Sequence, residues 1–118
     1  MLANTLTVTI NSVAKVLVRV NQDNFNSEYR LSTSTELLVL KIRNTTERSL
    51  GYPMERHNVD LAWTTHATLT EPEKFYSVSQ TFKKRIGAFQ DPTVLTQAVA
   101  GLATLVNAQA AAIVAGES

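Results

Sequence analysis

The stretch between positions 52 and 86, in which apolar and polar residues alternate, is the part of the chain around which the rest is organised. The alternation covers residues 57–65 and, after a turn-forming segment at residues 70–73, residues 76–86. Successive side chains of a β-strand point to opposite faces, so this period of two predicts two strands. Because the connection is short and contains Pro72, the strands are expected to form an antiparallel hairpin with one apolar and one polar face.

Alternation also predicts the strands that precede this hairpin. Residues 5–10 and 13–20 alternate on either side of a two-residue turn at Asn11 and Ser12, which predicts an amino-terminal hairpin. Two further strands are predicted over residues 28–33 and 37–45, and a loop over residues 46–51 leads into the central hairpin. In the second of these strands the core face is expected to consist of Leu38, Leu40 and Ile42.

The carboxy-terminal segment changes to a helical period. Asp91 and Pro92 form a strong helix start, because Asp accepts hydrogen bonds from free backbone amides and Pro suits the first helical position. Large aliphatic residues then recur every three or four positions as far as Ile113, and Gly116 marks the end. Asn107 interrupts the pattern, so the segment is expected to form two helices, or one helix that bends there.

These elements predict an α+β fold in a single domain of residues 1–118. Its parts are the amino-terminal β-hairpin (1–20), an antiparallel sheet of about five strands (27–87) and two carboxy-terminal α-helices (91–116). One Ala-rich helical segment covers only part of such a sheet, and the edge strands would be left open. We therefore predict an obligate, intertwined homodimer.

Composition limits the classes of function. The chain has no cysteine, which excludes disulfides, thiolate metal sites and cysteine nucleophiles, and its net charge of +1 does not by itself indicate nucleic-acid binding. The amino terminus lacks the features of a signal peptide. The longest apolar run, residues 110–115, is far shorter than the roughly 20 residues of a membrane span. The sequence therefore predicts a soluble, intracellular protein without membrane contact.

Candidate catalytic residues are few. His57 and His66 fall on opposite faces by parity, and no metalloprotease, phosphate-loop or nucleophile-elbow motif is present. Glu55 and Asp60 also lie on opposite faces, so they make a poor acid–base pair. We expect no enzymatic activity, no catalytic or metal site, no cofactor and no small-molecule substrate. Trp63 falls on the apolar face and is interpreted as a core residue.

The polar faces of three predicted strands carry cations among hydroxyls and amides. Equal parity would bring these side chains to one surface of the sheet, and they are the candidate RNA-binding residues: Lys41, Arg43, Thr45, Arg56, Asn58, Ser79, Thr81, Lys83 and Arg85. Such groups suit contacts to phosphates and base edges. A solvated sheet face explains the same spacing equally well, so the pattern alone leaves both interpretations open.

Several short stretches, taken with the order of the elements, resemble one known family. They are residues 6–10, 14–17, 20–23, 27–29, 41–43, 55–59 and 83–87, followed by the helical tail. The family is that of the coat proteins of the small single-stranded RNA bacteriophages, the levivirus type. The resemblance covers nearly the whole chain, and it rests on length, element order and local matches together rather than on one diagnostic motif.

The resemblance implies a structural capsid subunit in the virion, made in the cytoplasm of a bacterial host. Two subunits would join their sheets edge to edge and interlock their helices, and the dimers would assemble into an icosahedral shell around the genomic RNA. The inward sheet face would also bind an RNA hairpin, which represses replicase translation and directs packaging. The alternatives are a dimeric cellular RNA-binding regulator without a shell and, third, a small-ligand-binding dimer.

The resemblance also implies roles for particular residues. Carried over by position, the residues that match the family's RNA-binding strands are Lys41, Arg43, Arg56, Asn58, Ser79, Thr81 and Lys83. Tyr76 departs from the family pattern: parity places it on the apolar face, whereas many members have a base-stacking tyrosine near this point on the RNA face. The link at residues 70–73 is also shorter than the loop that lines the symmetry axes in many members.

Overall fold

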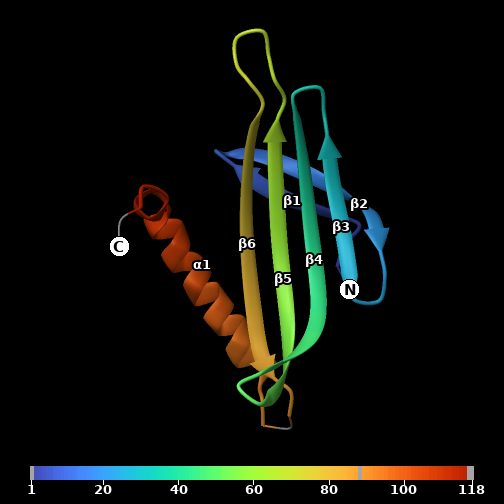
Figure 1. Cartoon of the computed structure of the whole chain (residues 1–118), viewed down its shortest axis with the longest axis vertical. Helices are drawn as coiled ribbons and strands as arrows, with labels where there is room; N and C mark the ends of the chain where they lie inside the picture. The colour runs from blue at the N-terminus through green and yellow to red at the C-terminus, as the bar shows by residue number, and fades with distance from the viewer. Residues whose placement is uncertain (1, 88, 117–118) are drawn as a thin grey trace.

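The computed structural model describes residues 2–87 and 89–116, which form six β-strands and one α-helix (Figure 1). The elements are β1 (Thr5–Ile10), β2 (Val13–Gln22), β3 (Asn26–Ser32), β4 (Glu36–Ser49), β5 (Tyr52–Thr65), β6 (Lys74–Arg85) and α1 (Pro92–Val114). All six strands belong to one antiparallel sheet, in which each strand pairs with its neighbours in the sequence. The fold is therefore roughly of the predicted α+β class, although the numbers of strands and helices differ.

The sheet curls so that the β1–β2 hairpin lies behind β3 to β6 in Figure 1. Leu17 of β2 packs there against Tyr29, Leu38 and Leu40, and these are the buried apolar side chains. Partly buried side chains surround them, namely Leu6, Val8, Ile10, Leu31, Ile42, Val59, Leu61 and Trp63. We call this side of the sheet the covered face. The opposite side, on which β4 carries Lys41, is called the open face.

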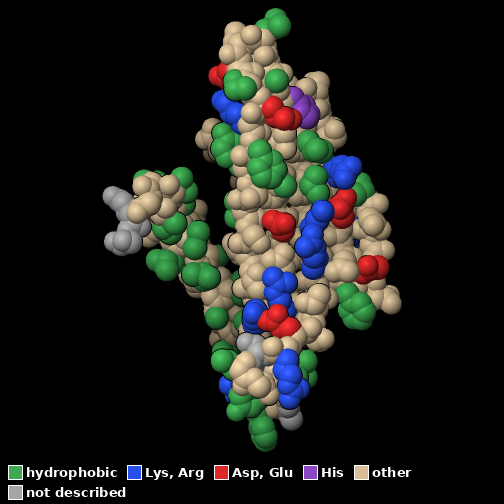
Figure 2. All heavy atoms as spheres, in the orientation of Figure 1, with side chains coloured by type: hydrophobic (Ala, Val, Ile, Leu, Met, Phe, Trp, Pro, Cys, Tyr) green, Lys and Arg blue, Asp and Glu red, His purple; other side chains and the backbone are tan. Residues whose placement is uncertain are grey.

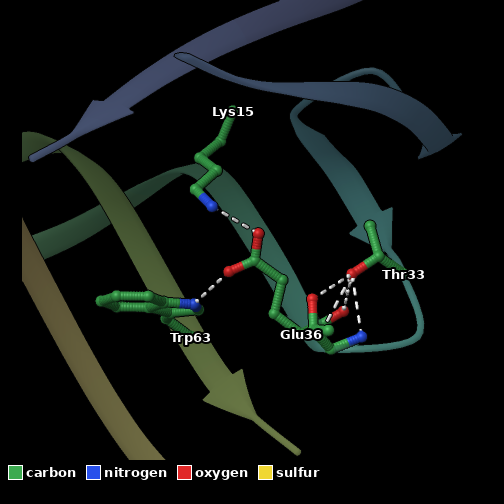
Figure 3. A network of polar contacts seen from close by, with 5 residues as sticks. Lys15, Thr33, Glu36 and Trp63 are labelled. Carbon is green, nitrogen blue, oxygen red and sulfur yellow. Dashed lines mark hydrogen bonds and ion pairs between the residues drawn. The ribbon is translucent and has the colours of Figure 1, made fainter. Parts of the chain in front are cut away.

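A polar network fastens the hairpin to the covered face (Figure 3). The Lys15 ammonium group of β2 donates to Glu36 Oε1 at 2.6 Å, and the Trp63 indole donates to Glu36 Oε2 at 2.9 Å. Glu36 is the first residue of β4 and follows a turn in which its own backbone amide donates to the Thr33 hydroxyl. One carboxylate thus links β2, β4 and β5, and Trp63 packs beside the core as the sequence predicts.

Replacing Glu36 with Gln is expected to lower the free energy of unfolding at neutral pH by about 1.5–3 kcal/mol, because a charge-assisted hydrogen bond is lost. The hydrogen bond from Lys15 holds the pKa of Glu36 below its usual value of 4.5, so the folded state binds fewer protons than the unfolded chain. This contribution is complete above pH 4.5 and is lost as the pH falls through the folded pKa. The thermal unfolding midpoints of wild type and Glu36→Gln should therefore differ at neutral pH and become equal in acid. A difference between the two midpoints that does not change with pH would contradict the role of the charged Glu36 carboxylate.

Strand β4 continues through the predicted loop at residues 46–51. Its ladder with β5 runs without interruption to the pair of Ser49 and Tyr52, so the loop prediction is wrong and only Leu50 and Gly51 form the turn. These two residues have φ values of 54° and 80°, as in the hairpin turns whose twist matches that of the flanking strands. The extension makes β4 and β5 equally long and lengthens both faces of the sheet.

The predicted amino-terminal hairpin is present, and its turn residues Asn11 and Ser12 have φ values of 50° and 65°. It is not separate from the sheet, however, because β2 also pairs with β3, and the sheet has six strands rather than about five. The register shifts between Arg19 and Asn21, and such a bulge bends a strand and increases its twist. This bend helps the hairpin to fold over the covered face.

The described carboxy-terminal residues form one helix, so the prediction of two helices is wrong. Asp91 caps α1 as predicted, because its Oδ1 accepts a hydrogen bond from the Thr93 amide at 2.9 Å and Pro92 occupies the first turn. The helix continues through Asn107, which falls on the same side as Thr96 at helical spacing. A polar residue on the polar side of an amphipathic helix does not interrupt it.

Most of the apolar side of α1 is exposed, and none of the helix's described residues is buried. Its first turns lie near β6, where the partly buried Leu95 and Val99 line a groove of about 460 Å³ together with Val78 and Phe82. Further along, the helix leans away from the sheet (Figure 1). The exposed apolar side chains on it are Val94, Leu102, Leu105, Val106, Ile113 and Val114. The helix therefore leaves an apolar surface that this chain does not cover.

Candidate nucleic-acid interface

The strand register places all the candidate RNA-binding residues on the open face. Directly opposed residues of an antiparallel ladder point to the same side, so each cross-strand row from β4 through β5 to β6 shares one face. The successive rows are Lys41–Asp60–Ser79, Arg43–Asn58–Thr81, Thr45–Arg56–Lys83 and Glu47–Met54–Arg85. Every candidate lies in one of these rows. The structure thus brings together side chains that are up to 44 positions apart in the chain (85 − 41 = 44).

The rows form a continuous surface that is accessible to a large ligand. Arg43, Lys83 and Arg85 are exposed, and Lys41 and Arg56 are partly buried. This face points toward the viewer in Figure 2, where Lys and Arg side chains gather over the middle and lower part of the sheet with acidic groups among them. The hairpin lies on the other side, and the described element that borders this face is α1, whose first turns line grooves with β6 residues that include Thr81 and Lys83.

Asn58 differs from the other candidates because it is only 7% exposed. Its side-chain amide donates to the Ser79 hydroxyl at 3.1 Å, the Thr81 hydroxyl at 3.0 Å and the Gln80 carbonyl at 3.2 Å. The amide hydrogens are thus already used within the sheet. Asn58 orients two hydroxyl groups on the open face, and those hydroxyls are the groups that a ligand would meet.

Tyr52 adds an aromatic ring that the candidate set does not include. Parity places it on the open face, and the Arg85 guanidinium lies 3.8 Å from the ring centroid, a cation–π contact. Tyr52 is also half exposed. Tyr76, by contrast, packs against Trp63 on the covered face with ring centroids 5.6 Å apart, as parity predicts. The open face thus has the ring of Tyr52 at one end of β5, and the register places the exposed ring of Phe75 on the same face at the other end.

Carboxylates lie among the cations of the open face. Glu28 forms ion pairs with Arg30 at 3.1 Å and with Lys41 at 4.0 Å, and Glu47 contacts Lys83. Cations remain in excess: the face carries Arg30, Lys41, Arg43, Arg56, Lys83 and Arg85 against Glu28, Glu47 and Asp60. Among the described residues, Arg43 and Arg56 have no carboxylate within 4.0 Å. This excess supplies the local basic clustering that the overall charge does not reveal.

A polar hollow of about 260 Å³ borders Lys41 and Arg43, next to the β2–β3 turn. Asp23 stabilises this turn, since its carboxylate accepts hydrogen bonds from the backbone amides of Phe25 at 2.8 Å and Asn26 at 2.7 Å. The hydrogen bond from the Phe25 amide is the main reason that the pKa of Asp23 lies below its usual value. The turn therefore presents a fixed negative charge near the two cations.

The histidines do not come together. His57 lies on the covered face, where its Nδ1 is 2.6 Å from the Asn44 amide oxygen and its Nε2 is 3.5 Å from Glu55. The hydrogen bond from Lys84 lowers the pKa of Glu55, so this carboxylate is held in its charged form. His66 follows the end of β5. The described residues thus give these groups structural contacts, and no acid–base pair is assembled on the open face.

A broad cationic face with hydroxyls and aromatic rings, next to an unpartnered helix, is typical of a subunit that binds other molecules over a large area. Consistent with this, residues 3–85 match the family model for the phage phiCb5 coat protein, and the chain belongs to this family. The match spans β1 to β6. No match was found among curated proteins. A coat protein is a structural component that assembles into a capsid, which agrees with the expected structural role and places the chain in the virion.

Proposed function

We propose that this chain is a coat subunit of the levivirus type, which forms homodimers and binds genomic RNA on its open face. The observation that carries the proposal is the set of cross-strand rows: cations and hydroxyls from β4, β5 and β6 share the face opposite the hairpin. Phosphate contacts from Lys and Arg provide affinity, and hydroxyl groups reach base edges or riboses. Ser79, Thr81 and Thr45 are the hydroxyls available for this purpose, and Asn58 positions the first two.

The dimer is proposed because of two features of the single chain, the outer edge of β6 and the apolar side of α1. Strand β6 has 12 residues and, within residues 2–87 and 89–116, pairs with β5 alone, so its outer edge offers free backbone hydrogen-bonding groups. Beside it, α1 exposes the apolar side described above. A second copy satisfies both needs at once, since β6 can pair with its counterpart while each helix covers apolar surface of the other chain. The same surfaces are contiguous at the groove between α1 and β6.

By length and composition alone α1 could also cross a membrane, since an 18-residue window has a mean hydropathy of 1.4. We assign it to the subunit interface instead because most of its large aliphatic residues, from Leu95 to Ile113, fall on one side. Thr93, Gln97 and Thr104 fall on the opposite side at helical spacing. A helix that crosses a membrane alone is surrounded by lipid, whereas a helix that packs on a second subunit needs only one apolar side.

The finer functions of the levivirus type are part of the same proposal. The open face would bind a hairpin in the phage RNA, and this complex would repress replicase translation and direct packaging into an icosahedral shell. Because Tyr76 is on the covered face, base stacking in this chain would fall to other rings of the open face, namely Tyr52, supported by Arg85, and Phe75. Unpaired bases in RNA loops commonly stack on aromatic rings and on guanidinium groups.

The recombinant chain is expected to elute from a size-exclusion column as a megadalton particle with absorbance at 260 nm well above that at 280 nm. Light scattering gives the mass, and the absorbance ratio reports packaged nucleic acid. A dimer without nucleic acid at every concentration and ionic strength would contradict both RNA binding and shell formation. A dimer that binds RNA but never assembles would favour the regulatory alternative.

A further inference from the structure

We propose that Glu47 is a specificity-determining residue of the open face, because it occupies the Lys83 ammonium group until an RNA phosphate displaces it. This inference rests on the proposed RNA-binding function of the face. It assigns Glu47 the role of an internal competitor, which favours ligands with several linked phosphates over single phosphates. Glu47 lies within the segment that the sequence predicts to be a loop, and only its position in strand β4 directs it to this face.

The geometry of the pair indicates this role. Glu47 is on β4 and Lys83 is on β6, in adjacent rows, so the two side chains reach each other across β5. Glu47 Oε1 is shielded from solvent and has no hydrogen-bond partner among the described residues, so the Lys83 ammonium group is its compensating charge. The side chains themselves remain 35% and 41% exposed. A ligand can therefore reach Lys83 from the open side without unfolding any element.

The pair is not needed to hold the sheet together. β4 and β6 are each joined to β5 by long backbone ladders, and ion pairs between half-exposed side chains contribute little to stability. The Lys15–Glu36 pair differs, because it fastens the hairpin on the covered face. An ion pair that spans the middle strand of a cationic ligand-binding face acts chiefly on the charge that the face presents.

When an RNA phosphate displaces Glu47 from Lys83, the carboxylate loses its compensating charge, and this loss opposes binding. When a phosphate neutralises a free cation, counterions of the RNA are released and binding becomes steeply salt-dependent. When it takes Lys83 from Glu47, the freed carboxylate must recruit a cation or water in its place. Arg43 and Arg56 have no such competitor within 4.0 Å in the described part of the chain. A strand whose neighbouring phosphates are already held by these arginines can complete the exchange, whereas a mononucleotide cannot.

The test uses the full chain in its unassembled form and a fluorescein-labelled single-stranded RNA, with anisotropy measured over a series of salt concentrations. Glu47→Gln is expected to bind several-fold more tightly than wild type. The slope of log K against log salt should become steeper by about 0.7, the increment of one phosphate contact, because no freed carboxylate has to take up a cation when the RNA binds Lys83. The affinity for a mononucleotide should increase by a larger factor in Glu47→Gln than the affinity for the RNA. Asp60→Asn is the matched control, because it removes the same charge from the same face, and Asp60 forms no ion pair within the part of the chain that the structure describes.

A double-mutant cycle with Lys83→Gln completes the test. In the Lys83→Gln background, Glu47→Gln should leave the salt slope unchanged, because no lysine is released. Equal effects of Glu47→Gln and Asp60→Asn on affinity and slope would overturn the proposal and indicate general charge repulsion only. An unaltered affinity in Glu47→Gln would overturn it as well. If wild type shows no salt-dependent RNA binding at all, the proposed function itself fails, and this outcome is distinct from the other two.

Discussion

Replacing Leu102 and Leu105 of α1 with Glu should abolish dimers and shells while the sheet of the monomer remains folded. Both side chains are more than half exposed in the single chain, at 59% and 56%, so charged replacements cost the monomer little. In a symmetric dimer each substitution acts twice. Full burial of a leucine contributes about 1.5–3 kcal/mol, so four lost contacts weaken the dimer by roughly 6 kcal/mol, or about 10⁴-fold.

Analytical ultracentrifugation measures the expected loss, and far-ultraviolet circular dichroism verifies that the strands remain. The matched control introduces the same charges on the polar side of α1, as Gln97→Glu and Thr104→Glu. These variants should retain dimers, because that side does not enter the proposed interface. Dimers that persist in the Leu102 and Leu105 variant would exclude this helix surface as the contact between subunits.

Replacing Lys41 and Arg43 with Ala should lower RNA affinity about 10²-fold at low salt and leave the dimer intact. Each cation is expected to make a charge-assisted contact to phosphate, and such contacts contribute about 1.5–3 kcal/mol apiece. Loss of two phosphate contacts should also reduce the salt slope by about 1.4 for a single strand. Both residues lie on the open face, in adjacent rows, so neither substitution disturbs the core.

Electrophoretic mobility shift or fluorescence anisotropy over a salt series measures both quantities. Arg48→Ala combined with Lys74→Ala is the matched control, since it removes two cations that the register places on the covered face. That variant should bind RNA nearly as well as wild type. An equal loss in the two variants would mean that net charge, rather than the open face, determines affinity.

The faces of the sheet follow from the sequence because alternation is a local property of a strand. Once the strands are antiparallel and in register, parity alone brings Lys41, Arg56 and Lys83 to one surface and Leu38 and Trp63 to the other. The turn at Asn11 and Ser12 and the helix cap at Asp91 are equally local, which is why the sequence predicts them correctly. RNA binding by the open face stays a proposal.

The errors arose where a local pattern was incomplete or where a contact between distant residues decides the structure. Residues 46–49 are all polar or charged and resemble a loop, yet pairing with β5 extends β4 to Ser49 and directs Glu47 to the open face. Asn107 interrupts an aliphatic pattern without breaking a helix that is otherwise rich in Ala. The hairpin is also fastened over the sheet by contacts among Lys15, Glu36 and Trp63, which no sequence period relates.

Because α1 and the open face differ in charge, contacts between subunits and contacts to RNA are expected to respond differently to salt. Between Pro92 and Val114 the helix has no charged residue, whereas the open face is dominated by arginine and lysine. Contacts made through α1 therefore gain strength in sulfate-rich solution, where apolar burial is favoured, and contacts to RNA weaken as salt rises. If the open face binds RNA and α1 joins the subunits as proposed, sulfate would weaken the contacts to RNA while it strengthens those between subunits, so a shell of this chain would be emptied without being taken apart.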